Sequence, residues 1–187
     1  MITPLQPDSG LPPDYPFDFE RHLTLESGHS IYVRPVVPGD AALLQEAAAV
    51  ADADTLYQRF FNPTVRLNEK RLRFLTEVDY VRRFALVAFS HGEGVAIARF
   101  EPAGEATAEV AVVVEPSWRR RGLATALLDL LEAAALERGI KTFEAYFLPE
   151  NHAIERVLEK RGFGGRSVDG GVAKVTRFLG KTGKSAG

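Results

Sequence analysis

Short runs of β-branched, aromatic and aliphatic residues, separated by turn residues, predict a chain that is rich in strands. These runs cover residues 22–25, 30–33, 84–89, 95–100, 107–115, 142–148 and 172–178. The first four predict two hairpins, with loops at 26–29 and 90–94. Within the fifth run, Val110–Val114 is apolar at every position, which predicts a central strand buried on both faces.

Between these runs, apolar residues recur three and four positions apart and predict helices. The expected helices cover residues 40–51, the surroundings of 56–61, 68–75, 122–138 and 154–158. Asp40 and Asn68 are the expected N-caps of the first and third, and Gly139 is the expected C′ residue of the fourth. The first helix is expected to bury a stripe made of Leu43, Leu44, Ala47, Ala48 and Val50. Strands followed by a β-α-β-α-β order predict a mixed α/β (α+β) fold, a sheet covered by helices.

The two ends of the chain differ in composition from its middle. Five of the eleven prolines lie within residues 4–16, so residues 1–20 are expected to form an extended arm. This arm could pack on a neighbouring copy as well as on its own domain, which leaves a homodimer open. Residues 21–180 are expected to form a single domain, and residues 181–187 a polar tail.

Composition and charge favour a soluble, cytoplasmic protein without a membrane or nucleic-acid partner. No run of about 18 apolar residues and no secretory signal pattern occurs. The chain has no cysteine, which excludes disulfides, thiolate metal sites and a cysteine nucleophile and fits a reducing compartment. The net charge of −2 argues against a nucleic-acid-coating protein, and the four histidines show no metal-ligand spacing.

The segment from the valine strand to the long helix is the best candidate for chemistry. Val112–Val114 is followed by the loop Arg119-Arg120-Arg121-Gly122 and then by the helix start Leu123-Ala124-Thr125. A helix N-terminus offers N–H groups and partial positive charge to an anion, a glycine lets the backbone approach closely, and arginines add charge. An arginine-glycine pair before a helix is common, so this loop alone is a weak phosphate signal.

Two motifs in sequence order resemble the GNAT superfamily of N-acetyltransferases. Arg119, Gly122 and Ala124 match its pyrophosphate pattern Gln/Arg-x-x-Gly-x-Gly/Ala, and Asn151 with residues 158–163 resembles its later helix. Over roughly residues 15–178 the chain also looks like the acetyltransferase domain of Pat-type bacterial protein lysine acetyltransferases. The segments that carry this second resemblance are Tyr15-Pro16, Leu25–Gly28, Val33-Arg34-Pro35, Asp40 and Arg59–Pro63. The resemblance implies a mixed, mostly antiparallel sheet of about six to seven strands flanked by helices.

The same resemblance implies that acetyl-CoA is the acyl donor and that no metal is needed. The residues implied to bind it are Val112, Val113, Val114, Arg119, Arg120, Arg121, Gly122, Leu123, Ala124, Thr125 and Asn151. The pantetheine arm would lie along the valine strand, with a backbone N–H near Val113 or Val114 polarising the thioester carbonyl. The N–H groups of residues 120–125 would hold the pyrophosphate. Asn151 would bind the pantetheine arm, or it is a plain N-cap.

Glu109 is the candidate general base. The implied acceptor is a primary amine, on a protein lysine or a small molecule, and only about one lysine in a thousand is neutral at pH 7. A carboxylate in an apolar strand is costly unless it is partnered or functional, and Ala108-Glu109-Val110-Ala111 resembles the surroundings of the Pat-type catalytic glutamate. Alternatively, Glu109 lies near enough to the strand start to be solvated.

Leu158 stands where many members of the superfamily have a tyrosine general acid. A thiol with a pKa near 8.5 leaves tolerably as thiolate, so the loss of this acid need not abolish turnover. Tyr146 could replace it or could only pack. The missing tyrosine also keeps a second hypothesis open, a non-catalytic CoA-binding regulatory or interaction module, whereas the paired motifs disfavour a purely structural domain.

Overall fold

The computed structural model describes residues 10–50 and 67–180. Its strands are β1 (Arg21–Thr24), β2 (Ser30–Pro35), β3 (Phe84–Ser90), β4 (Glu93–Pro102), β5 (Thr107–Val114), β6 (Thr142–Phe147), β7 (Gly164–Asp169) and β8 (Val172–Phe178). Its α-helices are α1 (Ala41–Val50), α3 (Glu69–Thr76), α4 (Leu123–Glu137) and α5 (His152–Lys160), and its 3-10 turns are η1 (Phe17–Phe19), η2 (Pro38–Asp40) and η3 (Pro116–Trp118).

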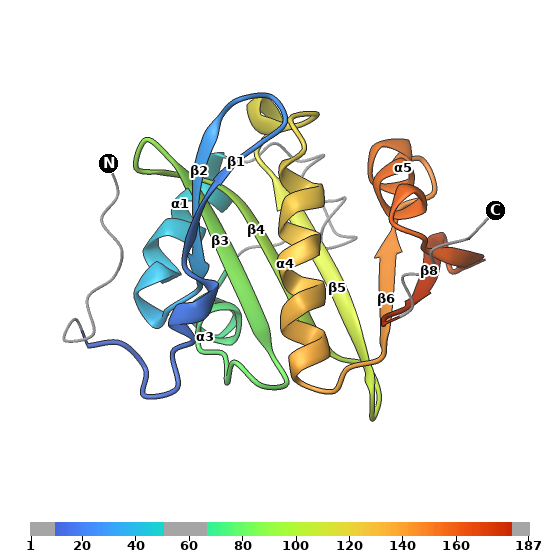
Figure 1. Cartoon of the computed structure of the whole chain (residues 1–187), viewed down its shortest axis with the longest axis horizontal. Helices are drawn as coiled ribbons and strands as arrows, with labels where there is room; N and C mark the ends of the chain where they lie inside the picture. The colour runs from blue at the N-terminus through green and yellow to red at the C-terminus, as the bar shows by residue number, and fades with distance from the viewer. Residues whose placement is uncertain (1–9, 51–66, 181–187) are drawn as a thin grey trace.

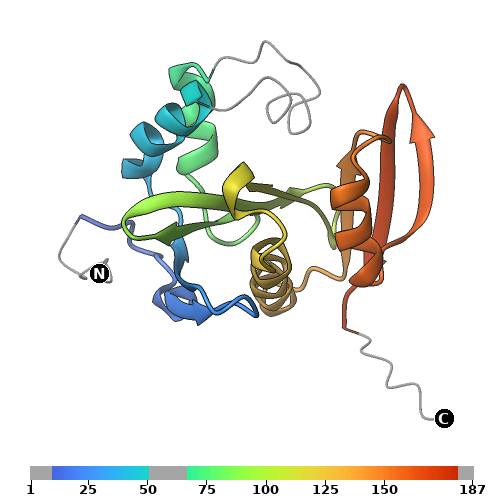
Figure 2. The same cartoon turned by 90° about the horizontal axis from the view of Figure 1, so that it is seen from above.

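The described strands form one sheet in the order β1-β2-β3-β4-β5-β6-β8-β7 (Figure 1). Every neighbouring pair is antiparallel except β5 and β6, which run parallel with α4 as the crossover between them. Figure 2 shows α4 on one face of the sheet and α1 with α3 on the other. The predicted fold class is therefore confirmed, with eight strands in place of the expected six to seven.

The additional strand is β7. All of its residues, Gly164–Asp169, are exposed, and it pairs only with β8 at the edge of the sheet. A strand with no buried face has no alternation of apolar and polar residues, so the pattern that predicts strands is absent from its sequence.

The helix predictions were right for α3 and α4 and partly wrong for α1. The Asn68 side chain caps α3 by accepting from the Arg71 N–H at 2.9 Å, and Leu72 and Leu75 are buried as expected. Gly139, with φ of 74°, follows α4. In α1, Ala47 is exposed and Leu43, Leu44 and Ala48 are only half-buried, so the stripe is shallower than expected. The side chain of Val50 and the expected helix around 56–61 lie outside the described residues.

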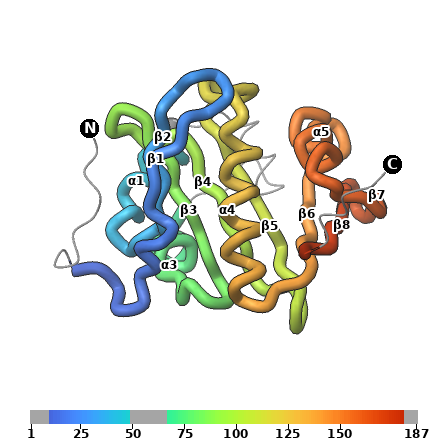
Figure 3. Tube along the Cα trace, viewed as in Figure 1, coloured from blue at the N-terminus to red at the C-terminus, as the bar shows by residue number. Residues whose placement is uncertain are grey.

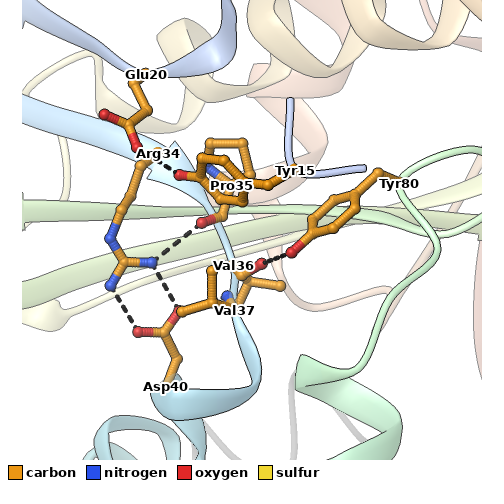
Figure 4. Close-up of polar contacts among 8 residues, drawn as sticks. All are labelled: Tyr15, Glu20, Arg34, Pro35, Val36, Val37, Asp40 and Tyr80. Atoms are coloured by element: carbon orange, nitrogen blue, oxygen red, sulfur yellow. Dashed lines mark hydrogen bonds and ion pairs between the residues drawn. The ribbon is translucent and has the colours of Figure 1, made fainter. Parts of the chain in front are cut away.

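Asp40 precedes α1, as expected. Its carboxylate was predicted to cap that helix, but it binds Arg34 and the backbone of the preceding loop (Figure 4). Two hydrogen bonds of 2.8 and 2.6 Å join it to the buried Arg34 guanidinium, and it accepts from the Val37 N–H at 2.8 Å. Burial lowers the pKa of Arg34, but the hydrogen bond and charge of Asp40 outweigh it and raise that pKa overall. This bidentate pair fixes the turn between β2 and α1, and removal of one partner would leave a buried charge.

The described part of the N-terminal arm packs on its own domain. Tyr15 and Phe19 belong to the core, and the Tyr15 hydroxyl donates to Glu20 at 2.7 Å. Burial, reinforced by Glu20, raises the pKa of Tyr15. Close by, the Tyr80 hydroxyl donates to the Val36 carbonyl at 2.8 Å (Figure 4). Burial, with a smaller contribution from Asp40, raises the pKa of Tyr80 to about 12, so both tyrosines keep their protons at neutral pH.

The main core lies between the sheet and α4. Leu123, Leu127 and Leu131 of α4 are buried against the strands. A row of rings runs across the sheet beneath them, with Phe84 stacked on Phe100 at 5.6 Å and Phe100 near Phe143 at 6.1 Å. This row joins β3, β4 and β6, so it holds the lower end of the sheet together.

Candidate active site

β5 and β6 are paired at only one end. Their register covers Thr107 with Thr142, Ala108 with Phe143 and Glu109 with Glu144, and beyond these pairs the two strands separate (Figures 1 and 3). Val110 is buried, whereas residues 111–114 are only half-buried. The expectation that this whole run is buried on both faces was therefore wrong. Its upper half lines a cavity, and Val112 and Val114 also pack against the edge of the main core.

This cavity has a volume of about 250 Å³ and lies where β5 and β6 part. Every predicted site residue except Arg121 lines it, namely Glu109, Val112, Val113, Val114, Arg119, Arg120, Gly122, Leu123, Ala124, Thr125 and Asn151. The opposite wall comes from β6 and α5 and includes Ala145, Tyr146, Phe147, Ile154, Val157 and Leu158. Residues more than forty positions apart in the sequence thus surround one apolar cleft with a basic end.

The hydrogen-bond pattern of β4 and β5 decides which backbone groups of β5 face the gap. The Ala103 N–H donates to the Thr107 carbonyl and the Glu115 N–H donates to the Val95 carbonyl. Because hydrogen-bonded pairs alternate along an antiparallel ladder, the odd-numbered residues of β5 direct their N–H and C=O groups to β4. Val113 therefore points its N–H away from the gap, and Val112 and Val114 point theirs into it. Of the two positions named for an oxyanion donor, only Val114 has the required direction.

The loop before α4 has the geometry of an anion site. Arg120 has φ of 60° and Gly122 has φ of 85°, and the helix begins immediately afterwards. Left-handed residues in such a turn direct successive N–H groups toward one side, and the first N–H groups of α4 have no partner within the helix. Arg119 also folds back over the strand end, where its Nε donates to the Val114 carbonyl at 3.2 Å. The outer side of the loop forms a shallow depression lined by Pro116, Ser117 and Arg119 to Arg121.

The side chain of Arg121 does not reach the cavity. Its Nη1 lies 2.7 Å from His29 Nε2 in the β1–β2 turn, and its guanidinium lies over the Trp118 ring at 4.7 Å from the centroid. The contact with the hairpin holds the Arg121 guanidinium away from the cavity, and its predicted role in binding the donor stays a prediction. A contribution of its backbone N–H stays a prediction.

Asn151 has the capping role that was left open for it. Its Oδ1 accepts from the Ile154 N–H at 3.3 Å, at the N-terminus of α5. It also lines the cavity, so the predicted contact with a pantetheine arm stays a prediction. Leu158 is 3% exposed and packs in the core, so position 158 offers no proton donor.

Glu109 lies at the vertex where β5 and β6 begin to separate. It is half-buried, and it is in register with Glu101 on β4 and Glu144 on β6. Residues in register share a face of the sheet, and Ala108 and Val110 pack on the α4 side. The three carboxylates therefore form a row on the opposite face, the face that carries α1 and α3 (Figure 2).

The two neighbours of Glu109 in this row are held by cations. Glu101 pairs with the buried Arg99 at 2.7 Å. Glu144 binds Lys174 Nζ at 2.8 Å and accepts from the Tyr146 hydroxyl at 3.0 Å. The hydrogen bond from Lys174 lowers the pKa of Glu144 and keeps that carboxylate ionised and occupied. The Tyr146 hydroxyl proton is engaged in the same cluster, so Tyr146 is not placed as a free acid. Nothing in the sequence pairs Glu144 with Lys174, since only the sheet register brings them together.

Comparison with known proteins decides the family. A model of the Acetyltransferase (GNAT) family matches residues 42–163. The chain belongs to the GNAT acetyltransferase family. The motif residues of this family member are those that line the cavity, from Arg119 at the loop to Asn151 on α5.

Individual relatives agree with this family membership. The chain is 32% identical over 145 residues to the acetyltransferase Pat of Mycolicibacterium smegmatis, a match that covers 74% of the chain and 42% of that relative. It therefore spans less than half the length of this curated relative. The GNAT domain of S. lividans PAT is 34% identical with a TM-score of 0.83, covering 89% of the chain and all of that domain.

A protein from Salmonella typhimurium determined with its cofactor acetyl-CoA shares the fold. It is 21% identical with a TM-score of 0.66, over 82% of this chain and 96% of that one. Within residues 10–50 and 67–180, no three histidine, aspartate or glutamate side chains are grouped as metal ligands would be. No helix in the same ranges is long and apolar enough to cross a bilayer.

Proposed function

We propose that this chain transfers an acetyl group from acetyl-CoA to a primary amine, with Glu109 as general base. The observation that carries the proposal is the gap between β5 and β6. It joins an apolar cleft, a basic loop at a helix N-terminus and a carboxylate at the vertex in one cavity. Family membership supports a CoA thioester as the donor.

The open half of β5 would bind the donor as an added strand. The N–H groups of Val112 and Val114 and the C=O of Val112, which face the gap, are suited to pair with the amides of a pantetheine arm, while Arg119 Nε binds the Val114 carbonyl. The N–H groups of residues 120–125 would then receive the pyrophosphate at the start of α4. Asn151 would contact the arm from the opposite wall. This arrangement directs the thioester down the gap, toward Glu109.

The chemistry needs a neutral amine beside the thioester carbonyl. Glu109 would take a proton from the ammonium, directly or through one water, and the nitrogen would attack the carbonyl carbon. A backbone N–H from the open half of β5 would stabilise the oxyanion of the tetrahedral intermediate. The intermediate would collapse with cleavage of the C–S bond, and CoA would leave as thiolate because Leu158 offers no proton. The amide nitrogen would lose its second proton to the released thiolate or to solvent, because Glu109 already holds the first.

The acceptor would approach from the face that carries the row of carboxylates. The proposal covers a protein lysine and a small-molecule amine equally, since both bring an ammonium to this face. The lack of cysteine in the whole chain supports a reducing, cytoplasmic setting as part of the same proposal. We also propose residues 21–180 as one acetyltransferase domain, on which the arm segment 10–20 packs.

A release assay tests the proposal. The protein is incubated with acetyl-CoA and a panel of amines and lysine-containing proteins, and free CoA is measured with and without acceptor. Acceptor-dependent release is the expected result. Tight acetyl-CoA binding without acceptor-dependent release across the panel would instead support a CoA-binding regulatory module. This module is the second candidate function because Leu158 cannot act as a general acid.

Glu109→Gln tests the base directly. The substitution keeps the shape of the side chain but removes its ability to accept a full proton at neutral pH. We expect turnover at pH 7 to fall more than tenfold while the Kd for CoA stays within twofold. Calorimetry and the release assay measure the two quantities separately.

Glu144→Gln is the matched control for Glu109→Gln. Glu144 occupies the same row on the neighbouring strand, where it binds Lys174 and Tyr146, and it does not line the cavity. We expect its substitution to change turnover less than threefold. Equal losses in the two variants, or no loss in Glu109→Gln, would remove Glu109 from the role of base.

A further inference from the structure

The turn between β1 and β2 touches the arginine-glycine loop, although the two are more than ninety residues apart in the sequence. Ser27 Oγ donates to the Arg121 carbonyl at 3.3 Å, and Arg121 Nη1 lies 2.7 Å from His29 Nε2. His29 Nδ1 lies 3.0 Å from Ser27 Oγ. The Trp118 ring completes the contact, edge-on to His29 at 5.4 Å and beneath the Arg121 guanidinium at 4.7 Å.

These three polar contacts fit together only when His29 is neutral. A guanidinium has donors and no acceptor, so Nε2 must accept from Arg121. The ring proton is then on Nδ1, which donates to Ser27 Oγ. The hydroxyl proton of Ser27 remains for the Arg121 carbonyl. The result is a closed ring of hydrogen bonds from Arg121 to His29, from His29 to Ser27 and from Ser27 back to Arg121.

This ring fixes the orientation of one peptide group in the loop. The Arg121 carbonyl and the Gly122 N–H belong to the same trans peptide and point to opposite sides. Ser27 holds the carbonyl toward the hairpin, so the Gly122 N–H points away from it. Arg121 also follows Arg120, a non-glycine residue with φ of 60°, where the backbone is strained unless its surroundings hold it.

We propose that Ser27 and His29 are positioning residues for the phosphate-binding loop, which they hold in its binding conformation through Arg121 while His29 is neutral. The inference rests on the proposed function, since it assumes that this loop binds the pyrophosphate of CoA. Protonation of His29 places an N–H donor against a guanidinium that can only donate, and like charges then face each other. The charged group that faces His29 across the contact is Arg121, and the other groups against it, Ser27 and Trp118, are uncharged. The loop therefore loosens when His29 takes up a proton.

Trp118 reports on this contact without any ligand. It is the single tryptophan of the chain, so its fluorescence is not masked by others. We expect the emission of the ligand-free protein to change with pH between about 5 and 8, and His29→Gln to abolish that change. His22→Gln is the matched control, since His22 lies in the same hairpin but its ring contacts Tyr32. It should leave the titration as in the wild type.

CoA affinity tests the positioning role, measured by calorimetry at pH 7.5 and 5.5. At pH 7.5, His29→Ala and Ser27→Ala should each weaken CoA binding about three- to tenfold, because each removes two of the three bonds of the ring. His29→Gln should stay within twofold, because its Oε1 can accept from Arg121. Between the two pH values the wild type should lose about threefold or more in affinity relative to His29→Gln. Comparison with that variant cancels the protonation of the CoA phosphates.

Wild-type CoA affinity in His29→Ala at pH 7.5, or the same pH dependence of affinity in His29→Gln as in the wild type, would overturn the inference. A Trp118 titration that persists in His29→Gln would overturn the contact itself. If the wild-type protein binds CoA at neither pH 7.5 nor pH 5.5, the proposed function is contradicted. The Trp118 titration then decides separately whether the hairpin holds the loop.

Discussion

The two halves of β5 differ in their partner strands and in their roles. In the lower half, Thr107–Val110, residues 108–110 pair with β4 and residues 107–109 pair with β6, and Ala108 and Val110 are buried. The upper half, residues 111–114, is paired with β4 alone and is half-buried. Ala108 and Val110 of the lower half are buried in the core, whereas Val112 and Val114 of the upper half pack on its edge and line the cavity.

The difference shows how two strands that separate can form a binding site along their open edges. Where β6 turns away, the even-numbered residues of the upper half keep their N–H and C=O groups directed at an empty strand position. In the lower half, the same groups are used by β6. The vertex between the halves, at Glu109, is where structural pairing ends and the proposed chemistry begins.

A valine-to-alanine substitution in each half should distinguish the two roles. Its effect on the free energy of unfolding is the largest that we expect. Val110→Ala removes two methyl groups from a site that is 3% exposed, so we expect a loss of about 2 kcal/mol in the free energy of unfolding. Val112→Ala should cost less than about 1 kcal/mol, because its side chain faces the cavity. Urea denaturation measures both values.

CoA affinity should reverse that order. Val112→Ala should weaken CoA binding about twofold to threefold, and Val110→Ala should leave it unchanged in the folded protein. Equal destabilisation by the two substitutions would show that the upper half packs as the lower half does, which would break the comparison.

A smaller but more specific effect is expected at the glycine beyond the open half. Gly122 has φ of 85°, and a Cβ built there meets nothing within 4 Å, so only the backbone conformation demands glycine. Gly122→Val should push the loop out of this conformation and weaken CoA binding about tenfold. Calorimetry with CoA is the measurement.

Gly92 supplies the control for Gly122. It has φ of 95° in the turn between β3 and β4, also with nothing within 4 Å of its Cβ position, and it does not line the cavity. Gly92→Val should lose a similar amount of stability and keep its CoA affinity. A loss of affinity in both variants would indicate general destabilisation in place of a site at the loop.

The parts that sequence could predict are those whose signal is local. The turn at Gly122, the cap at Asn68 and the apolar run of β5 are each encoded within a few residues. The resemblance of Arg119, Gly122 and Ala124 to a family motif located the loop for the same reason. Arg119, Gly122 and Ala124 line one cavity with the residues of β5 because β5, the loop and α4 are continuous in the chain.

The parts that sequence missed depend on register and on distant contacts. The pairing of Glu144 with Lys174 and the contact of His29 with Arg121 join residues with no shared local pattern. Asp40 stands where an N-cap is expected, yet a buried arginine six residues earlier takes its carboxylate. The half-burial of residues 111–114 was hidden because a cavity wall and a core face have the same hydrophobic sequence.

Amide exchange along β5 tests the central claim most directly. The N–H of Val113 points to β4, and those of Val112 and Val114 point into the gap. In the ligand-free protein, NMR-detected exchange should therefore be slow at Val113 and fast at Val112 and Val114, and saturating CoA should slow only the latter two. Fast exchange at these two amides that CoA leaves unchanged would contradict the claim that the open half of β5 binds the donor.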